Sequence, residues 1–342
     1  MPRIAFVGTE LAPLREESGA LERVVLAWAA GLRATPGFEI VCLDADPLLG
    51  LPLDRLEAVG PDLLVLNNRP LWAEKTDVEV LHVLHNYPDA WGEQSDDLPR
   101  VRRALEGARG VVAVSSALAR DVEDAYQLTR GVREVRAAVE VGFFAEAWRG
   151  RGGPVVFPNR LLEKKGVRLF LEIAERLSER GHRCQMSRHL APWSAPTSEQ
   201  AALLELIEEC GAVELLPPPV TRAAMAAWYA SAGVIICPSV RPEGLGLVAL
   251  EAQAVGAPLV TSGLGGLAEA TFPPNEVVAS LDPEEWCGAV GRALARSSAT
   301  GPRQRVEELH GLDAAVSSLR TQIARPCDQP SDAKEQVEGT RE

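Results

Sequence analysis

The 342-residue sequence predicts an α/β protein with two domains, each built around a parallel sheet. Short β-rich apolar runs alternate with segments of helical spacing, which is the pattern of buried parallel strands covered by helices. The alternation restarts after the Gly/Arg-rich stretch at 140–154. The length also exceeds the commonest single-domain size and fits two domains of about 150 residues.

The first half opens with a strand, a helix and a second strand. RIAFVG at 3–8 is a short apolar strand, and SGALERVVLAWAAGL at 18–32 repeats apolar residues at helical spacing. FEIVCLD at 38–44 then gives the second strand. Further strands are expected at 63–67, 78–85 and 110–115. Ser115 or Ser116 can cap the helix that follows the last of these strands.

The second half repeats the alternation. Its expected strands are VVF, RCQMS, AVELL and GVIICPS, and its expected helices lie near 166–180, 198–209 and 221–230. We therefore expect an N-terminal domain over 1–145, a C-terminal domain over 146–302, a last helix over 303–325 and a disordered tail over 326–342.

Composition and charge exclude several classes of partner. The net charge of -13 argues against binding of nucleic acid or anionic lipid, which the chain would repel. The basic stretch at 99–109 is better explained as a solvated helix face, so peripheral membrane contact is not expected. The six cysteines are scattered without a CxxC pair, and neither a signal peptide nor a long apolar span is present. We expect a cytoplasmic protein with reduced thiols and no transmembrane segment.

Two carboxylates interrupt the apolar stretch RPEGLGLVALEAQAVGAPLV. Glu243 is expected in a loop and Glu251 in the second turn of a helix, with the open amides of the helix start, at about 246–248, between them. Two acids beside an anion site make sense if they accept hydrogen bonds from neutral donors such as sugar and ribose hydroxyls, at about 1.5–3 kcal/mol each. Glutamates are also favoured in loops and early helical turns by the helix dipole, which is the simpler alternative.

A pair of cationic side chains is expected at the same edge of the sheet. NRLLEKKGV at 159–167 places Arg160 and Lys165 where a strand ends and a helix begins, which is the usual ligand edge of an open α/β sheet. The chain has only four lysines and a net negative charge, so a solvated surface explains this pair poorly.

These stretches resemble the motifs of a known enzyme family. PSVRPEGLGLVALEAQAVGAPLVTSGLGGLAEA resembles the E-x7-E signature of the family-4 retaining glycosyltransferases, and NRLLEKKG resembles their G-R-L-x-x-x-K-G phosphate motif. SGALERVVLAWAAGL is similar to the opening helix, VLHVLHN to the histidine segment, and VVAVSSALARDV to the strand and helix after it. The similarity covers roughly residues 3–300. It implies the GT-B fold, in which two Rossmann-like domains face a central cleft.

The resemblance also implies an activity and roles for individual residues. A sugar would move from a nucleoside-diphosphate donor to a small or medium acceptor with retention of configuration, needing no metal and no cofactor besides the nucleotide-sugar substrate. Glu243 would contact donor-sugar hydroxyls, Glu251 the ribose, and Arg160 with Lys165 the diphosphate. His85 would face the transferred sugar. Further donor contacts would come from Gly244, Gly246, Leu247, Val248 and Gly19.

Polar residues at two strand ends of the first half are the candidates for acceptor contacts. Asn67 and Arg69 follow one strand, and Asn86 and Tyr87 follow His85, although ordinary loop polarity explains them about as well. His82 is expected to be a packing residue and a poor partner for His85 in metal binding, because we expect the two to point to opposite faces of the strand. Asp44-Ala45-Asp46 matches a DxD metal signature, which a strand end often matches by chance.

The sequence departs from the family pattern in places that leave other functions open. Ala20 replaces the second glycine of the first loop, Asn159 replaces the glycine before Arg160, and Phe143 with Phe144 stand in the usual N-G-V-D linker. SRHLAPW also replaces an expected glycine-rich turn. One alternative is therefore a non-catalytic scaffold that binds a nucleotide sugar. Another is an enzyme of the same fold that couples through nitrogen or sulfur, or epimerises the nucleotide sugar.

Several properties stay open at this stage. The sequence names neither the sugar, the base, the acceptor nor the oligomeric state. Its Arg- and Ala-rich, Lys-poor composition is typical of a high-GC bacterial source, which permits a role in carbohydrate or natural-product biosynthesis.

Overall fold

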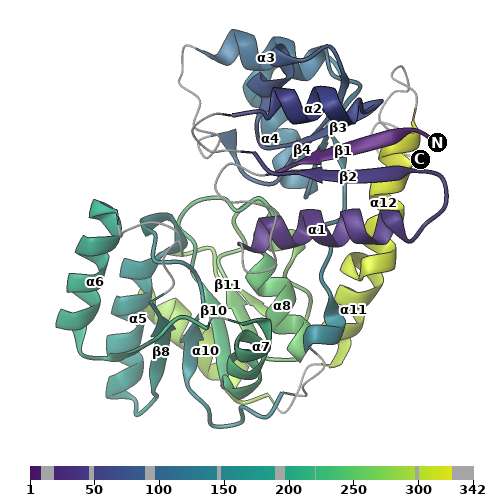
Figure 1. Cartoon of the computed structure of the whole chain (residues 1–342). Helices are drawn as coiled ribbons and strands as arrows, with labels where there is room; N and C mark the ends of the chain where they lie inside the picture. The colour runs from purple at the N-terminus through teal and green to yellow at the C-terminus, as the bar shows by residue number, and fades with distance from the viewer. Residues whose placement is uncertain are drawn as a thin grey trace, which may run out of the picture. The chain divides into compact units, whose positions relative to one another are not determined.

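A computed structural model describes most of the chain as two units, each with its own six-stranded parallel sheet (Figure 1). One unit comprises Met1–Ala138 and the described residues from Leu309 onward, and the other comprises Val139–Glu308. The two parallel sheets confirm the predicted α/β class. The first segment of the N-terminal unit ends at Ala138, and the expected boundary is residue 145. The described residues are 1–8, 19–45, 50–88, 97–144, 148–188, 197–219, 221–296 and 300–325.

The N-terminal unit has the strand order β2-β1-β3-β4-β5-β6. Its central strands are apolar runs buried on both faces, as parallel strands require. Asn67 pairs in register with Val83, so β3 and β4 end at the same edge of the sheet. The strands are β1 (Arg3–Val7), β2 (Glu39–Leu43), β3 (Leu63–Asn67), β4 (Glu79–Leu84), β5 (Gly110–Ala113) and β6 (Arg133–Glu134). The helices are α1 (Ala20–Arg33), α2 (Leu53–Val59), η1 (Pro70–Lys75), α3 (Leu98–Glu106) and α4 (Ser116–Tyr126).

The chain returns to the N-terminal unit at its end. The single helix expected over 303–325 is two helices, α11 (Thr300–His310) and α12 (Leu312–Ala324), because Gly311 between them has an extended backbone. The backbone N–H of Arg136 donates to Ser318 Oγ on α12, and α12 lies beside α1 (Figure 1). The predicted tail at 326–342 lies outside the described residues.

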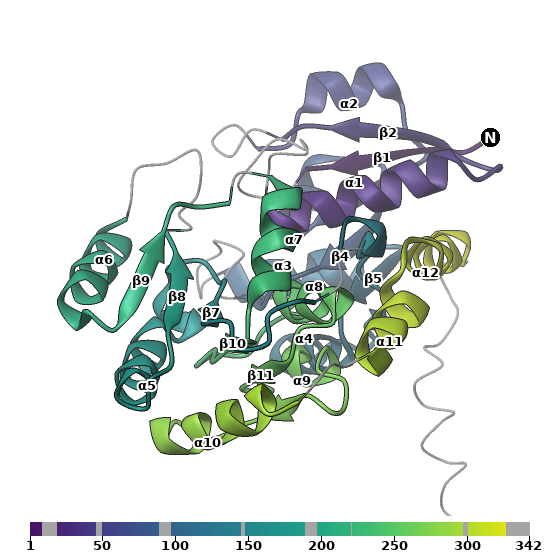
Figure 2. The ribbon, with the colours of Figure 1, turned by 90° about the horizontal axis from the view of Figure 1, so that it is seen from below.

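The C-terminal unit has the strand order β12-β11-β10-β7-β8-β9. Helices α5, α6 and α10 pack on one face through a cluster that includes Phe157, Phe170 and Trp286, while α7 and α8 lie over the other face (Figure 2). The strands are β7 (Val155–Phe157), β8 (Cys184–Ser187), β9 (Val213–Leu216), β10 (Val234–Cys237), β11 (Leu259–Thr261) and β12 (Glu276–Val277). The helices are η4 (Val141–Phe144), η5 (Glu163–Lys165), α5 (Val167–Glu179), α6 (Ser198–Cys210), α7 (Arg222–Ser231), α8 (Leu247–Val255), α9 (Gly266–Glu269) and α10 (Pro283–Leu294).

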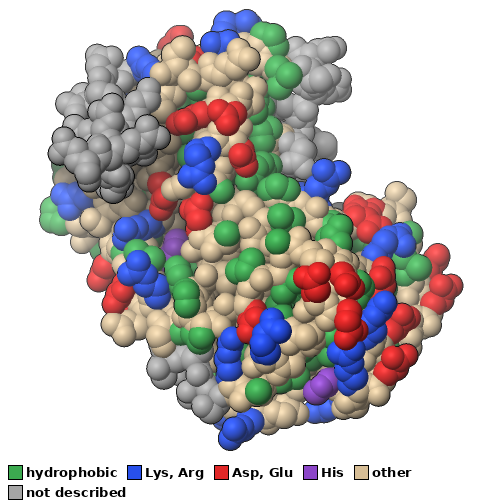
Figure 3. Space-filling view, turned by 180° about the vertical axis from the view of Figure 1, so that it is seen from behind, with side chains coloured by type: hydrophobic (Ala, Val, Ile, Leu, Met, Phe, Trp, Pro, Cys, Tyr) green, Lys and Arg blue, Asp and Glu red, His purple; other side chains and the backbone are tan. Residues whose placement is uncertain are grey.

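The surface mixes charges of both signs. On the face shown in Figure 3, Lys and Arg side chains are interspersed with Asp and Glu. The five cysteines in the described part of the chain are free thiols. None of the helices formed by the described residues has the length and apolar character needed to cross a membrane.

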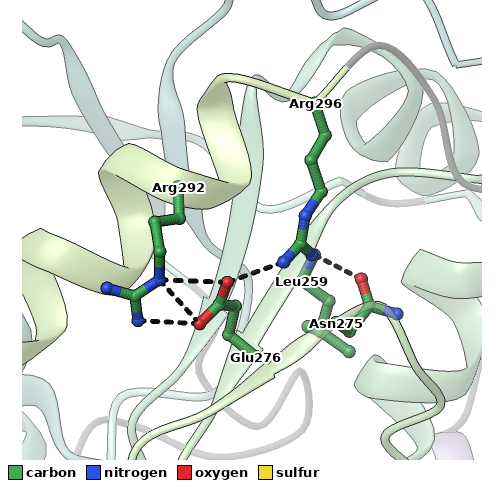
Figure 4. A network of polar contacts seen from close by, with 5 residues as sticks. All are labelled: Leu259, Asn275, Glu276, Arg292 and Arg296. Carbon is green, nitrogen blue, oxygen red and sulfur yellow. Dashed lines mark hydrogen bonds and ion pairs between the residues drawn. The ribbon is translucent and has the colours of Figure 1, made fainter.

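Strand β12 at the edge of the C-terminal sheet is tied to α10 by an ionic network (Figure 4). Glu276 accepts hydrogen bonds from Arg292 and Arg296, at 2.8 Å to Nη2 of Arg292 and 2.6 Å to Nη2 of Arg296. The hydrogen bonds and charge of these arginines lower the pKa of Glu276 despite its partial burial. The amide of Leu259 donates to Asn275 Oδ1 at 3.0 Å and joins β11 to the turn before β12.

Candidate functional site

Glycine at position 166 brings Lys165 against the loop that follows β10. Gly166 has a φ of +80°, which favours glycine, and a Cβ there would overlap the carbonyl oxygen of Pro238. The amide of Val240 also donates to the carbonyl of Lys164 at 3.0 Å. The end of η5 and the loop carrying Glu243 are therefore held in direct contact.

Lys165 and Glu243 form a two-point ion pair in this contact. The lysine Nζ lies 2.7 Å from Oε1 and 2.6 Å from Oε2 of Glu243, and both side chains are largely buried. Ser239 Oγ donates to Glu243 Oε1 at 2.5 Å. Burial alone raises the pKa of Glu243, but the charge and hydrogen bonds of Lys165, and then the bond from Ser239, outweigh it and lower the pKa. The Glu243 carboxyl is therefore ionised at neutral pH.

The ion pair leaves hydrogen-bonding capacity on both partners. An ammonium group has three N–H donors and a carboxylate offers about four lone-pair sites. Lys165 uses two of its donors on Glu243, which leaves a third for an anionic oxygen. Glu243 Oε2 accepts from Lys165 and has a further lone pair for a hydroxyl. One compact group can thus bind an anion and a hydroxyl at the same time.

Helix α8 begins next to Glu243 without a side-chain cap. Its N-cap is Gly246, with a φ of +93°, and a Cβ there would meet Leu267 Cδ1 at 2.5 Å. The amides of Leu247 and Val248 belong to the first turn, where a helix provides no internal acceptor. These two residues are half-buried, whereas Gly244 is buried. The predicted open helix start is confirmed, and its amides and dipole favour an anion.

Glu251 lies in the second turn of α8, as predicted, and is 9% exposed. Its Oε2 accepts a hydrogen bond from the hydroxyl of Tyr229 on α7, at 3.2 Å. The sequence shows no local signal for this partner, because Tyr229 lies on a different helix and in an ordinary apolar pattern. Ser239 was also missed, although it belongs to the same loop as Glu243.

Arg160 follows β7, which is the strand next to β10 in the sheet. Its side chain is exposed, and its carbonyl accepts from the amide of Leu162 at 2.9 Å. Asn159, in place of the family's glycine, is buried. The structure thus brings Glu243, Lys165 and the start of α8 together and puts Arg160 at the end of the neighbouring strand.

In the N-terminal unit, His85 lies at the end of β4 in a fixed setting. Its Nε2 is 2.9 Å from Asn67 Oδ1, and the side-chain Nδ2 of Asn67 in turn donates to the carbonyl of Val7 at 2.9 Å. Because Asn67 Oδ1 can only accept, Nε2 carries the proton and Nδ1 is the acceptor. The His85 ring lies 5.6 Å from that of Trp28. Burial lowers the pKa of His85 to about 3, so the imidazole is neutral at physiological pH.

The other predicted residues of this unit have different settings. Asn67 is buried and supports His85, which favours a structural role over direct acceptor contact. Tyr87 donates to Asp121 on α4 at 2.7 Å, and the amide of Asn86 donates to Asn68 Oδ1. Arg69 lies over the ring of Trp72, 5.7 Å from its centroid.

Gly19 is the N-cap residue of α1 and is half-buried. A Cβ at Gly19 would meet Glu22 Oε2 at 2.6 Å.

The described residues contain no group of three or more His, Cys, Asp or Glu side chains that could hold a metal ion. His82 is fully buried in β4, as expected of a packing residue, and burial lowers its pKa to about 4. The second acid of the Asp44-Ala45-Asp46 stretch lies outside the described residues.

Known proteins resemble this chain in sequence. Residues 153–296 match the model of the family described as glycosyl transferases group 1. The D-inositol 3-phosphate glycosyltransferase of Xylanimonas cellulosilytica is 30% identical over 286 residues, which span 73% of this chain and 67% of that protein. The chain belongs to the family-4 glycosyltransferases. The enzyme of the same name from Mycobacteroides abscessus is 33% identical to this glycosyltransferase over 180 residues, which span half of the chain but only 40% of that relative.

Solved structures share the fold of this glycosyltransferase at low sequence identity. Sucrose-phosphate synthase from Thermosynechococcus elongatus is 18% identical with a TM-score of 0.78, and the match covers 94% of this chain and 98% of that chain. HepE from Anabaena, in a complex with UDP and glucose, is 14% identical with a TM-score of 0.75, covering 95% and 100%. These neighbours are GT-B glycosyltransferases, so the GT-B fold predicted from the sequence is confirmed.

Proposed function

We propose that this glycosyltransferase transfers a sugar, with retention of configuration, from a nucleoside-diphosphate donor to a hydroxyl of a small or medium acceptor. The observation that carries the proposal is the Lys165–Glu243 ion pair beside the uncapped start of α8. It supplies a donor for an anion and an acceptor for a hydroxyl at one position, which a nucleotide sugar needs where its diphosphate joins its sugar.

In this proposal each residue has a distinct task on the donor. Glu243 accepts from hydroxyls of the sugar, and Glu251 accepts from the ribose. The third N–H of Lys165, the exposed guanidinium of Arg160 and the amides at Gly246, Leu247 and Val248 stabilise the diphosphate. Gly244 in the same loop makes a further contact with the donor. These cationic and dipolar groups oppose the charge that develops as the nucleoside diphosphate leaves, which is the largest electrostatic demand of the transfer.

The N-terminal unit contributes neutral groups in this proposal. His85, held by Asn67, accepts from a sugar hydroxyl through Nδ1, while Arg69, Asn86 and Tyr87 contact the acceptor at the neighbouring strand ends. Gly19 lets the first loop approach the donor. We further propose that the acceptor attacks from the leaving-group side and that no metal is required.

Names of relatives narrow the choice of substrates to test. The relatives are named for inositol 3-phosphate, a small polar acceptor, and the HepE structures contain UDP, glucose or UDP-glucose. We therefore propose a small polyhydroxyl acceptor, with UDP-sugars as the first donors to screen. The scattered cysteines support the further proposal of a cytoplasmic enzyme. The sugar itself is left to the experiment.

The test combines donor binding with turnover. UDP-, GDP-, ADP- and dTDP-sugars are screened by thermal shift, since a ligand at a hundred times its dissociation constant stabilises by about 2.7 kcal/mol. Release of nucleoside diphosphate is then measured with and without inositol 3-phosphate and other polyols. We expect Glu243→Ala and Lys165→Ala to reduce release by about a hundredfold or more. Glu276→Ala, which removes an arginine-paired carboxylate at the sheet edge, is the matched control and should keep activity.

Each outcome separates the proposal from its alternatives. Transfer that survives both site substitutions undiminished would contradict the assigned roles. Donor binding without transfer to any acceptor would favour the non-catalytic scaffold, which the substitutions at Ala20 and Asn159 motivate. An inverted product would contradict retention while leaving the donor site intact.

A further inference from the structure

Tyr229 is a buried phenol whose hydroxyl contacts a carboxylate of the proposed donor site. It lies on α7 and is fully buried, and its OH donates to Glu251 Oε2 on α8 at 3.2 Å. A buried tyrosine hydroxyl needs a polar partner, and a carboxylate that is itself 9% exposed gains from a fixed donor. The contact joins two helices that cover the same face of the C-terminal sheet (Figure 2).

The ring of Tyr229 is held in place on its other side. Phe144 in η4 stacks on it with the ring centroids 6.3 Å apart and the planes within 18°. Phe144 is 2% exposed and stands in the linker where the family pattern has a polar sequence. The preceding residue, Trp228, anchors α7 to β8 through a bond from Nε1 to Gln185 Oε1 at 3.2 Å. The hydroxyl of Tyr229 therefore has little freedom to leave Glu251.

A donor held at one oxygen of Glu251 limits the orientations that its carboxylate can adopt. Tyr229 occupies one lone pair of Oε2 and so restricts rotation of the Glu251 carboxylate. The remaining lone pairs then point in a defined direction, and acceptance from two adjacent hydroxyls requires such preorganisation.

We propose that Tyr229 is a positioning residue that orients Glu251 toward the vicinal hydroxyls of the donor's ribose, with Phe144 supporting its ring. This inference rests on the proposed function, in which Glu251 accepts from the ribose. This orientation makes the site selective for ribonucleoside diphosphates, because a ligand without these hydroxyls forfeits its hydrogen bonds to the Glu251 carboxylate. The Phe144 substitution in the linker is then part of the donor site's support.

The test compares ribonucleotides with their counterparts that lack both ribose hydroxyls. UDP, GDP and ADP are titrated into the full-length protein by calorimetry, and the tightest of them is then compared with its 2′,3′-dideoxy form. For Tyr229→Phe we expect the ribonucleotide to bind about fivefold more weakly and the dideoxy form to be unchanged. Glu251→Gln should also lower the affinity for the ribonucleotide alone. Adding Tyr229→Phe to this variant should have little further effect on the affinity.

Control variants separate positioning from a structural role. Trp228→Phe removes the neighbouring side-chain hydrogen bond of α7 and should change neither affinity. Phe144→Leu keeps the phenol but loosens its support, so we expect a smaller, selective loss of ribonucleotide affinity. This variant also tests the proposal if Tyr229→Phe folds poorly.

Two results would overturn the proposal in different ways. In the first result, Tyr229→Phe lowers the affinity for both nucleotides equally, or it lowers neither affinity while Glu251→Gln lowers that for the ribonucleotide. Tyr229 then does not position Glu251, and the proposed function stands. If no ribonucleoside diphosphate binds, or Glu251→Gln leaves the affinity for both forms unchanged, the proposed role of Glu251 fails and this inference fails with it.

Discussion

The two units differ in the charge of the groups at the carboxyl ends of their parallel strands. In the N-terminal unit, β3 and β4 end in neutral groups, where Asn67 holds the imidazole of His85. In the C-terminal unit, the strand β10 leads into a charged pair between Lys165 and Glu243. Both sites are mostly buried, and both follow from parallel strands that end together. The shared fold therefore provides the location, while the residues at the strand ends determine the charge.

Burial acts on the two sites in the same direction, but only one has a counter-charge. Burial disfavours the charged form of any group, so it lowers the pKa of His85 to about 3. The same effect would raise the pKa of Glu243, yet the nearby Lys165 lowers it instead. His85 is thus neutral because burial acts on it without an opposing effect, whereas Glu243 stays ionised because Lys165 supplies a counter-charge.

The largest effect should come from breaking the ion pair of the C-terminal unit. Lys165→Ala leaves the Glu243 carboxylate largely buried without its cation, which we expect to destabilise this unit by about 3 kcal/mol and to reduce transfer by about a hundredfold or more. Replacing both partners in Lys165→Met/Glu243→Gln should restore most of the stability but none of the activity. Urea unfolding and nucleoside diphosphate release measure the two effects. Activity in the double variant would show that the charges serve stability alone.

Sequence reasoning predicted the fold well because the signals were local. The expected strand at 63–67 is β3, and the capping of α4 by Ser115 is confirmed by the bond from the amide of Leu118. The break at Gly311 was missed, since a single glycine in an amphipathic pattern does not by itself end a helix.

The candidate site was predicted only in part, because some of its contacts are between distant segments. Glu243 and Lys165 were each singled out, but their pairing depends on the close approach at Gly166. Tyr229 and Glu251 meet across two helices, and no periodicity shows which residues of packed helices touch. The role of Asn67 as a support for His85 also requires the register of β3 and β4.

The second effect, which sharpens the contrast, is a pH dependence carried by the N-terminal unit. His82 and His85 have a pKa of about 4 and about 3 in the folded chain, against about 6.5 when unfolded. At a pH between the folded and the unfolded pKa, the unfolded state binds more protons than the folded state. The free energy of unfolding therefore falls as the pH drops through this range. From pH 7 to pH 5 we expect a loss of about 2 kcal/mol for each histidine. The described part of the C-terminal unit has no buried histidine and should change less.

Denaturant unfolding at the two pH values tests this prediction, with the fluorescence of the buried Trp28 reporting on the N-terminal unit and that of Trp286 on the C-terminal unit. Phe substitutions of the other tryptophans isolate each signal. His82→Leu should remove about 2 kcal/mol of the loss in the N-terminal unit, while His85 and the buried His310, whose pKa is also lowered, keep their contributions. An equal loss of stability in both units would contradict the assignment to these histidines.

A third and smaller effect distinguishes the helix starts of the two units. Helix α4 is capped by Ser115, whereas α8 starts at Gly246 with no side-chain cap. Ser115→Ala should destabilise the N-terminal unit by about 1 kcal/mol without affecting nucleotide affinity. Gly246→Ala introduces a Cβ at a positive φ and close to Leu267, so we expect about 1–2 kcal/mol of destabilisation together with weaker nucleotide binding. Thermal unfolding and UDP titration of both variants measure the difference.

The smallest effect should come from Arg292 in the ionic network at the edge of the C-terminal sheet, because this side chain lies far more in solvent than Lys165 or Glu243. The side chain of Arg292 is 63% exposed, so its pair with Glu276 is screened, and Arg292→Ala should change the free energy of unfolding very little. Arg296 is 25% exposed and donates to the same carboxylate, and it keeps Glu276 paired in that variant. Raising the salt from 0.05 to 0.5 M should remove what remains of the Arg292 effect, while the loss caused by Lys165→Ala should persist. If salt removed the effects of Arg292→Ala and Lys165→Ala to the same extent, the Lys165–Glu243 pair would be screened as strongly as the exposed Arg292. Burial would then not be the reason why the Lys165–Glu243 pair is suited to bind a ligand.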